Sequence, residues 1–330
     1  MSDIENEIER RTLKKPRVVE PMSAANGQTW HCGRVLEIKA MDPPNEIGVV
    51  VVGLGIAGKV RVRDLKAKTG CLVLKGVVSR RQSDIEGVAQ ISLKEALDRT
   101  DVKAVIISTE PALHEEYIRL ALEKGKHVLV EYPVALTATT ARQLFQLAED
   151  KGLVLYEENI AMLTESYLAI REKSSTVGVK QVNYSLSGSY NGWLENFEGS
   201  GLPFISGVSG IQVMLSLFGD LVVKGGKMDR QEDGYTAQAS LETQKGRPIT
   251  MTLSRSSSKE ARRIKQTVYE FEDGEVLDAG KIAQKSSKPG LFMQDMENFE
   301  EIVGKGKLPD GSKWLSVRSL EIAEHIHSFF

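Results

Sequence analysis

The stretch IGVVVVGLGIAG, residues 47–58, decides the fold of this chain. Its first half is a nearly continuous run of β-branched residues, which is typical of a parallel strand covered on both faces. Its second half has the spacing GxGxxG, and residues 57–66 carry apolar side chains at helical spacing. The stretch therefore predicts a buried strand, a tight turn and a helix, which is the first unit of an α/β fold.

The three glycines of this turn have separate tasks. Gly53 permits the tight turn, Gly55 lets a pyrophosphate approach the backbone, and Gly58 lets helix and strand pack closely. GxGxxG alone is weak evidence, since an ordinary glycine-rich turn has it too, but a strand before it and a helix after it favour a dinucleotide site. The residues expected to bind the cofactor here are Gly53, Leu54, Gly55, Ile56, Ala57 and Gly58.

The pattern of strand, turn and helix repeats as far as residue 156. Gly125 and Gly152 stand where C-terminal αL caps belong, and Ser92 with Glu95 forms a capping box. This alternation predicts βαβ units and a parallel sheet. The expected strands are residues 47–53, 72–79, 103–108, 127–131 and 153–156, and the expected helices are residues 57–66, 93–99, 113–125 and 137–152.

The pattern changes after residue 158. A bridging helix is expected over residues 160–171, and polar and apolar residues then alternate as in antiparallel strands with one wet face. The apolar stretch 205–219 predicts a helix that covers the other face. The four strand stretches are residues 180–190, 235–244, 248–256 and 264–279.

The fold class is therefore expected to be α/β with two domains, which a length of 330 residues allows. A dinucleotide-binding Rossmann domain is expected over residues 46–158. An α+β substrate-binding domain with a large open, mainly antiparallel sheet is expected over residues 159–330. Residues 1–45 precede the pattern and are expected to form a disordered tail, in which Met22 and Met41 are alternative starts.

Composition excludes several classes. Charged residues are 27% and the net charge is -2, so there is no electrostatic case for nucleic acid. The first residues lack the apolar run of a signal peptide, and apolar runs such as residues 49–52 are far shorter than the ~20 residues of a membrane span. Cys32 and Cys71 form no CxxC pair, which predicts no metal site and fits a cytoplasmic protein.

Ser79, Arg80 and Arg81 follow the second expected strand, where NAD-preferring domains place an acid. A guanidinium can bind the 2′-phosphate of NADPH with two hydrogen bonds and stack on the adenine. These residues therefore predict NADPH as the cofactor. A solvated pair of arginines is the alternative interpretation, and Asp84 leaves NADH open.

The turn GLGIAG and the stretch STEPALHEEYIRLALEKGKHVLVEYP, residues 108–133, resemble the glucose-fructose oxidoreductase/inositol dehydrogenase (GFO/IDH/MocA) family. The resemblance implies an NAD(P)-dependent oxidoreductase in which Glu131 and Tyr132 are catalytic. It also implies that the cofactor contacts Ser108, Thr109, Glu110, Pro111, His114, Glu131 and Tyr132.

The tripeptide Glu131-Tyr132-Pro133 replaces the usual Glu-Lys-Pro of the family, and with VSRR, GVAQISLKEAL and SLFGDL it is similar to the biliverdin reductases. This resemblance implies NADPH-dependent reduction of biliverdin to bilirubin by hydride transfer to the central methine carbon. It implies a tetrapyrrole substrate and a monomer or homodimer. The residues it places at the substrate are Glu157, Glu158, Arg262, Arg263 and Lys265, for which solvated surface charge is the alternative.

The sequence lacks residues that the oxidation of a sugar alcohol requires. Members of the family that oxidise sugar alcohols carry an Asp and a His where Ile205 and Ser209 align, and Tyr132 replaces a lysine. A conjugated tetrapyrrole needs less help, since a ring nitrogen takes up the proton from solvent or a nearby hydroxyl. Asn159 and Gly199 depart from the biliverdin reductase pattern, in which a His and an Arg are expected.

Two other hypotheses about the function remain open at this point. The chain could be another oxidoreductase of the same family, acting on a sugar-like or imine substrate, or a scaffold that has kept the cofactor site and lost turnover. Arg318 and Ser319 stand where mammalian biliverdin reductases have a His/Cys-rich tail. His325 and His327 point to different faces of a helix, so no metal site is expected there.

Overall fold

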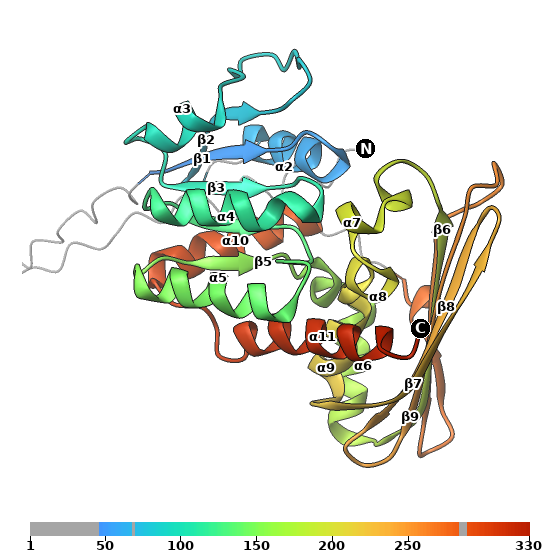
Figure 1. Cartoon of the computed structure of the whole chain (residues 1–330). Helices are drawn as coiled ribbons and strands as arrows, with labels where there is room; N and C mark the ends of the chain where they lie inside the picture. Colours follow the sequence, from blue (N-terminus) through green and yellow to red (C-terminus); the bar gives the residue numbers. More distant parts are fainter. Residues whose placement is uncertain (1–45, 68–69, 284–288) are drawn as a thin grey trace, which may run out of the picture. The chain divides into compact units, whose positions relative to one another are not determined.

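Two β-sheets organise the chain (Figure 1). The structure is a computed structural model, and it describes residues 46–67, 70–283 and 289–330. The expectations for residues 1–45, which include the tail, Cys32 and the alternative starts Met22 and Met41, lie outside the described residues. The fold class is α/β, as predicted.

The first sheet has the order β2-β1-β3-β4-β5, and its paired strands are all parallel. The order reverses between β1 and β3, and ligands bind at such a switch point beyond the carboxyl ends of the strands. The predicted parallel sheet is confirmed. Its strands are β1 (Ile47–Val52), β2 (Leu72–Val78), β3 (Ala104–Ile107), β4 (His127–Val130) and β5 (Leu155–Glu157).

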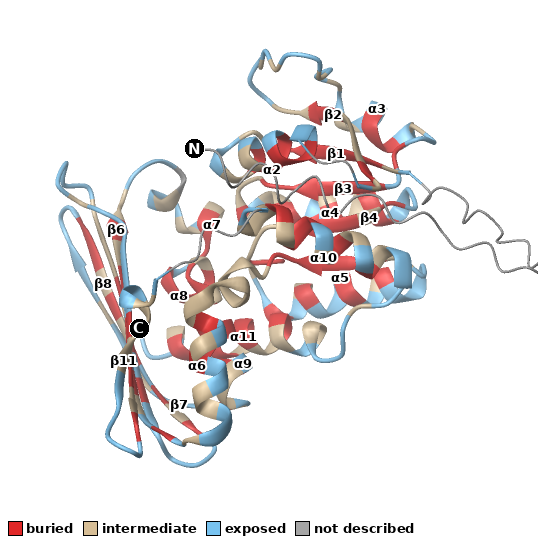
Figure 2. Cartoon of the chain, turned by 180° about the vertical axis from the view of Figure 1, so that it is seen from behind, coloured by how far each residue is buried: buried red, intermediate tan, exposed pale blue. Residues whose placement is uncertain are grey.

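Helices cover both faces of this sheet (Figure 2). On one face, Val49 and Val51 pack in a cluster with residues of α2 (Ile56–Ala67) and α10 (Leu291–Lys305). On the other, Val50 and Val52 pack in a cluster with residues of three helices. These are α3 (Leu93–Asp98), α4 (His114–Glu123) and α5 (Ala138–Asp150). One face of the first sheet is therefore partly covered by α10, a helix from the C-terminal part of the chain.

The helix ends predicted at Ser92, Gly125 and Gly152 are confirmed, and Thr137 adds a further cap. The side chains of Ser92 and Thr137 accept hydrogen bonds from the backbone N–H of the residue three positions on, as N-caps do. Gly125 and Gly152 have φ of 72° and 64°, which favours glycine at a helix end. The predicted single helix over residues 160–171 is wrong, because Thr164 caps a new helix there. The two elements are η2 (Ile160–Leu163) and α6 (Glu165–Thr176).

The second sheet has the order β11-β10-β6-β9-β8-β7 and is mainly antiparallel, as predicted. The exception is the pair β6 and β9, which runs parallel; the long connection between them contains helices and the strands β7 and β8, and it allows the chain to return in the same direction. The strand β7 was missed, since LVVKGGKMDRQ has no clean alternation and contains a bulge. The strands are β6 (Val179–Ser189), β7 (Leu221–Gln231), β8 (Gly234–Thr243), β9 (Pro248–Ser256), β10 (Ile264–Phe271) and β11 (Val276–Asp278).

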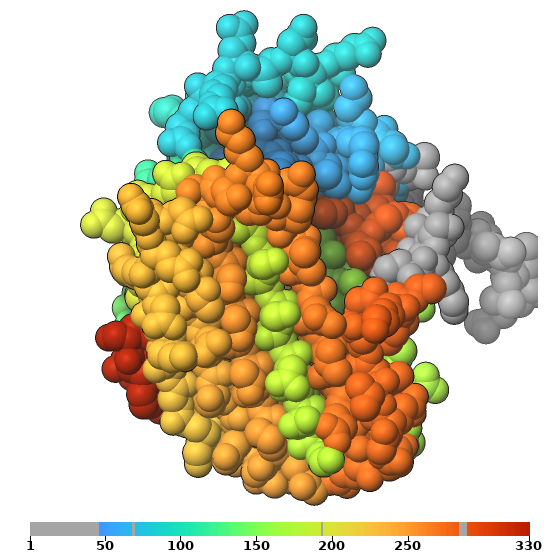
Figure 3. All heavy atoms as spheres, turned by 90° about the vertical axis from the view of Figure 1, so that its right-hand side faces the viewer, coloured from blue at the N-terminus to red at the C-terminus, as the bar shows by residue number. Residues whose placement is uncertain are grey.

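The two faces of this sheet differ in polarity. Figure 3 shows the outer face, with β6 in its middle, and outward side chains such as Asn183, Ser185 and Thr250 are exposed. The inner face packs against α9 (Val208–Phe218) and α11 (Ser312–His327). The short elements nearby are η3 (Gly192–Glu195), α7 (Phe197–Ser200), α8 (Pro203–Ser206) and η4 (Ala279–Lys281). The predicted wet face and covering helix are confirmed.

A single hydrophobic cluster extends from α4 and α5 through α9 and α11 to the inner face of the second sheet. The division into domains at residue 158 therefore stays a proposal. Of the helices that the structure describes, none combines the length and the apolar character that a membrane crossing requires.

His327, near the C-terminus, generates a prediction on stability. Its Nε2 accepts a hydrogen bond from the backbone N–H of Phe204 at 3.1 Å, and burial lowers its pKa from 6.5 to about 4. Between these pH values only the unfolded chain takes up the proton, so the free energy of unfolding falls as the pH is lowered. The wild type should lose up to about 3 kcal/mol more than His327→Gln over this range. Denaturant unfolding of both proteins checks this, and parallel pH profiles would contradict it.

Candidate dinucleotide and substrate site

The glycine-rich turn connects β1 to α2. Gly53 has φ of 92°, and a Cβ on Gly58 would lie 1.9 Å from the carbonyl oxygen of Gly53, so only glycine fits at these two positions. A Cβ on Gly55 would meet no atom of the described protein within 4 Å. Gly53 and Gly58 thus serve the fold, whereas Gly55 leaves backbone open to a ligand.

Four segments meet at the carboxyl ends of the parallel strands. The turn 53–58 follows β1, residues 79–81 follow β2, residues 108–111 follow β3, and residues 131–132 follow β4. The N-terminus of α2 offers unpaired backbone N–H groups at the same edge, which suits phosphate. The residues present therefore fit a dinucleotide, and they are the ones that the sequence predicts.

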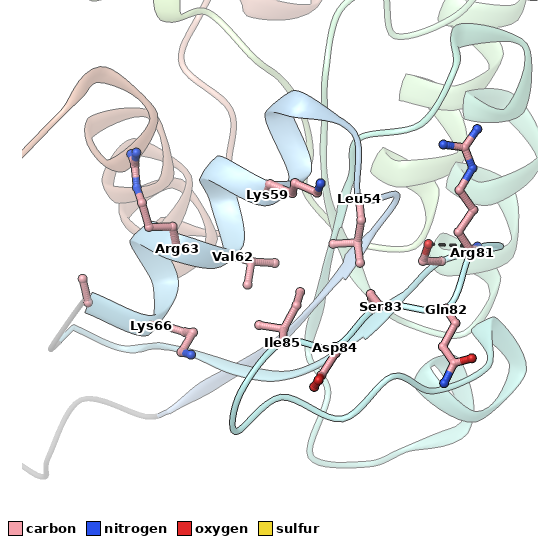
Figure 4. Close-up of a pocket in the computed structure, with 12 residues that line it drawn as sticks. Leu54, Lys59, Val62, Arg63, Lys66, Arg81, Gln82, Ser83, Asp84 and Ile85 are labelled. Atoms are coloured by element: carbon pink, nitrogen blue, oxygen red, sulfur yellow. Dashed lines mark hydrogen bonds between the residues drawn. The ribbon is translucent and has the colours of Figure 1, made fainter.

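A cavity of about 730 Å³ adjoins the turn and the end of β2. In Figure 4 its apolar centre is formed by Leu54, Val62 and Ile85, and Arg81 extends from its edge. The remaining lining residues are Lys59, Arg63, Lys66, Ala67, Ser79, Gln82, Ser83 and Asp84. The cavity is therefore apolar at its centre and mostly cationic at its rim.

The two arginines after β2 have different partners. Arg80 forms an exposed ion pair with Glu110 at 2.6 Å, which bridges the loops after β2 and β3. Arg81 forms no ion pair with any described residue, and its backbone N–H donates to Ser79 Oγ at 3.2 Å. Arg81 is therefore the cation of this pair that is available to an anionic ligand.

A buried charge network lies beneath the end of β4. Arg61 of α2 is fully buried, and its guanidinium contacts Glu131 Oε1 at 3.1 Å and Asp295 Oδ2 at 2.7 Å. Asp295, on α10, also accepts a hydrogen bond from the Tyr156 hydroxyl at 2.9 Å. Burial lowers the pKa of Arg61, but the two carboxylates outweigh it and raise that pKa. The network fixes Glu131, the neighbour of Tyr132.

Glu158 is the acid that this network does not neutralise. It is 4% exposed, and its Oε1 accepts only a backbone N–H, from Ile160 at 2.7 Å, among the described donors. Burial and the charges of Glu131 and Asp295 raise its pKa well above the usual range, although Arg61 opposes them. Glu158 therefore keeps a proton at pH values where ordinary carboxyl groups have lost theirs.

Tyr132 faces basic residues of the second sheet. Burial and Glu158 raise the pKa of its hydroxyl, whereas the neighbouring Arg263 lowers it. Burial and Arg263 in turn lower the pKa of Lys265, whose Nζ lies 5.8 Å from the ring centre of Tyr184. The structure thus brings Tyr132, Glu158, Arg263 and Lys265 together, as the resemblance implied.

His114 is fully buried, and its ring nitrogens lie 2.8 Å from the Pro133 carbonyl oxygen and 3.1 Å from that of Thr109. Burial lowers its pKa, although both carbonyls oppose this. The ring therefore ties the loop after β3 to the peptide that follows Tyr132, and His114 positions these loops without reaching a ligand itself.

Two of the predicted substrate residues, Glu157 and Arg262, have partners elsewhere and do not join the group around Tyr132. Glu157 is buried, and its carboxylate accepts hydrogen bonds from the Val134 backbone N–H, Gln212 and Ser316. It therefore joins β5 to α9 and α11. The Arg262 guanidinium donates to the carbonyl oxygens of Lys259 and Ala261 in its own loop.

Sequence reasoning missed Arg61 and Asp295, and it also missed Arg255, a cation on β9 that lies beside Tyr235 of β8. Arg61 lies on a helix where a cation looks like solvated surface, and its partner Asp295 is distant in the chain, so no local signal exists for this pair. Arg255 had a signal, because it continues the inward alternation of Met251 and Leu253 on β9.

The glycines yield a pair of matched substitutions. Gly58→Ala should destabilise the fold severely, since its Cβ would overlap the Gly53 carbonyl, which is backbone and cannot move cheaply. Gly55→Ala should fold normally but raise the Kd for NADPH about tenfold or more, because the methyl group enters the phosphate position. Thermal melting and fluorescence titration check the two effects. Tight NADPH binding by Gly55→Ala would contradict the placement of the phosphates.

Comparison with known proteins confirms the resemblance. The model of the oxidoreductase family with an NAD-binding Rossmann fold, GFO/IDH/MocA, matches residues 47–159. Biliverdin reductase A of Homo sapiens is 36% identical over 271 residues, which are 80% of this chain and 88% of the human protein. Biliverdin reductase A of Mus musculus is 35% identical over 293 residues, 86% of this chain and 96% of the mouse protein.

Solved structures share the fold. A biliverdin reductase from Synechocystis sp. PCC 6803, in complex with biliverdin and NADP+, has a TM-score of 0.71 at 24% identity and covers 86% of this chain and 98% of its own. A 3-ketoreductase from Actinomadura kijaniata, in complex with NADP and TDP-benzene, has a TM-score of 0.73 at 21% identity with the same coverage. The family model and the sequence relatives show that this chain belongs to the GFO/IDH/MocA family and is an NAD(P)-dependent oxidoreductase.

Proposed function

We propose that the protein reduces biliverdin to bilirubin with NADPH. The observation that carries the proposal is the position of Tyr132, at the carboxyl edge of the first sheet and beside Arg263 of the second, which has Lys265 as its neighbour. A site that joins a dinucleotide edge to an unneutralised basic surface suits a substrate with carboxylates. The sequence similarity to biliverdin reductase A of human and mouse supports this substrate.

The cofactor would occupy the edge formed by the loops after β1 to β4. NADPH supplies a hydride when bound. The turn at Gly55 would hold the pyrophosphate, and Arg81 would hold the 2′-phosphate, because Arg80 already has Glu110 as a partner. We also propose that the protein is located in the cytoplasm.

The residues around Tyr132 would orient the substrate and retain a proton. Arg263 and Lys265 would bind a propionate, and Glu158, whose pKa is raised by burial, would retain a proton close to the substrate. No base is required, since reduction adds a proton instead of removing one. Ile205 is buried and apolar, and Ser209 has no ionisable side chain, so neither replaces the Asp and His of the alcohol-oxidising relatives.

The direct test mixes the purified protein with NADPH and biliverdin and follows the absorbance change from green to yellow. Conversion at a rate that depends on the protein concentration supports the proposal. Tight NADPH binding without conversion would favour a scaffold role. Oxidation of NADPH by sugar-like ketones alone would favour another oxidoreductase of the family.

Arg81 and Arg80 form a second matched pair. Arg81→Ala should raise the Kd for NADPH about tenfold to a hundredfold and leave that for NADH nearly unchanged, because only NADPH has the 2′-phosphate. Arg80→Ala removes an exposed pair with Glu110 and should have a much smaller effect. Titration of both cofactors against both variants measures this. Equal weakening of NADPH and NADH by Arg81→Ala would show that Arg81 does not contact the phosphate.

Tyr132→Phe tests the source of the proton. If Tyr132 orders substrate and cofactor without donating an obligatory proton, kcat should fall by less than about tenfold, since removing a true general acid costs roughly 10²–10⁴-fold. The measurement is steady-state kinetics at saturating NADPH, with circular dichroism to verify folding. A loss in the larger range would identify the Tyr132 hydroxyl as the donor.

A further inference from the structure

A row of cationic side chains crosses the inner face of the second sheet. Arg230 on β7 pairs with Tyr235 on β8, Tyr235 pairs with Arg255 on β9, and Arg255 pairs with Gly188 on β6. Tyr235 is 3% exposed and belongs to the core, which assigns the row to the inner face, because paired residues on adjacent strands point to the same side. Arg263 follows next in the row, since Ile264 pairs with Ser187.

The row ends beside Tyr132, and the guanidinium of Arg255 lies in the space above Gly188, which has no side chain. A Cβ on Gly188 would lie 2.4 Å from Arg255 Nη1, so the guanidinium of Arg255 lies over β6 on the side of Arg263. Arg230 and Arg255 are two strands apart, which places their backbones ~10 Å from each other. The row therefore continues the site at Tyr132 across the sheet.

These cations lack carboxylate partners among the described residues, unlike their neighbours; Arg255 lies beside the Tyr235 hydroxyl and Arg263 beside the Tyr132 hydroxyl. Within the described ranges, Arg230, Arg255, Arg263 and Lys265 form no ion pair with any carboxylate. Cations elsewhere on the same sheet do: Lys224 pairs with Glu242, Lys180 with Glu270, and Arg247 with Glu272. Like charges gathered on one inner face repel each other unless an anion lies among them. The pattern predicts an anionic ligand with more than one charge.

Aromatic rings flank the same row. Tyr235 lies 5.4 Å from Tyr190 and 5.6 Å from Phe197, between ring centres, in edge-to-face contacts. The Arg230 guanidinium lies 5.2 Å from the ring centre of Phe197, which holds its long side chain over the inner face. Because α7, which carries Phe197, packs on η1 (Pro111–Leu113), the rings adjoin the loop after β3. A flat, conjugated ligand fits such a wall.

We propose that Arg230 and Arg255 bind a carboxylate of the substrate and so extend the site at Tyr132 into a receptor for a flat, conjugated dicarboxylate. Arg263 and Lys265 bind the carboxylate nearer to Tyr132, and Arg230 with Arg255 binds the one further along the sheet. The inference rests on the proposed function only in the identity of the ligand, because the row of cations and the aromatic wall are independent of it.

The test measures binding without turnover, in the presence of saturating NADP+. Biliverdin and its dimethyl ester are titrated against the wild type and Arg230→Gln/Arg255→Gln. The double variant should bind biliverdin at least about tenfold more weakly, since each lost charge-assisted hydrogen bond costs about a factor of ten or more. The dimethyl ester has no carboxylate and should bind both proteins equally within about twofold.

Two further variants control for charge and folding. Lys224→Gln/Lys227→Gln removes the same charge from β7, at residues that pair with Glu242 and Asp229, and should bind biliverdin like the wild type. Arg230→Lys/Arg255→Lys keeps the charge and loses the planar fork, so it should recover part of the affinity. Melting temperatures of all variants verify that the fold is retained.

The outcomes separate this inference from the proposed function. Unchanged biliverdin binding by the Arg→Gln variant, or equal weakening of the acid and the ester, would overturn the inference even if biliverdin is reduced. If the wild type neither binds nor reduces biliverdin, stilbene-4,4′-dicarboxylate is titrated instead. Binding that depends on both arginines then supports the receptor and rejects biliverdin, and binding that does not depend on them overturns the inference.

Discussion

The buried contact of Arg61 with Glu131 and Asp295 is the constraint on which the site depends. It connects α2, the end of β4 and α10, elements that are far apart in the chain. A guanidinium that is fully buried must keep its carboxylates, because the loss of one partner leaves a charge without compensation at a cost of about 3–5 kcal/mol. The same contact fixes the backbone that carries Tyr132, so the packing of α10 and the geometry of the site are coupled.

Positive charge lies on both sides of this contact, at the cofactor edge and on the second sheet. At the cofactor edge, the open backbone at Gly55, the N-terminus of α2 and Arg81 attract phosphate. On the second sheet, Arg255 and Arg263 form part of a row without carboxylate partners among the described residues. The acids Glu131 and Asp295 lie between the two and are held by Arg61, whereas Glu158 lies near them without an ion pair among the described residues. Such an arrangement suits a substrate whose negative groups can contact the cations of the second sheet while its electrophilic centre faces the cofactor edge.

The sequence predicted those parts of the fold that local rules determine. GxGxxG with a strand before it and a helix after it predicted the turn, and caps such as Ser92 and Gly125 predicted helix ends. It did not predict that β6 and β9 run parallel, because strand direction depends on long-range topology. Nor could it separate Glu158 from Glu157, or Arg263 from Arg262. Neighbours in the chain point to opposite sides, and only the packing of α9, α11 and the second sheet decides which side faces the site.

The central claim is that the edge of the first sheet and the basic inner face of the second act on one molecule, so that reducing equivalents pass from the nicotinamide to a bilin. The most direct measurement uses NADPH deuterated at both C4 positions, with biliverdin as substrate, followed by mass spectrometry and proton NMR of the product. The account predicts one deuterium in bilirubin, located at the central bridging carbon. Bilirubin without the label, or with the label at another carbon, would contradict it.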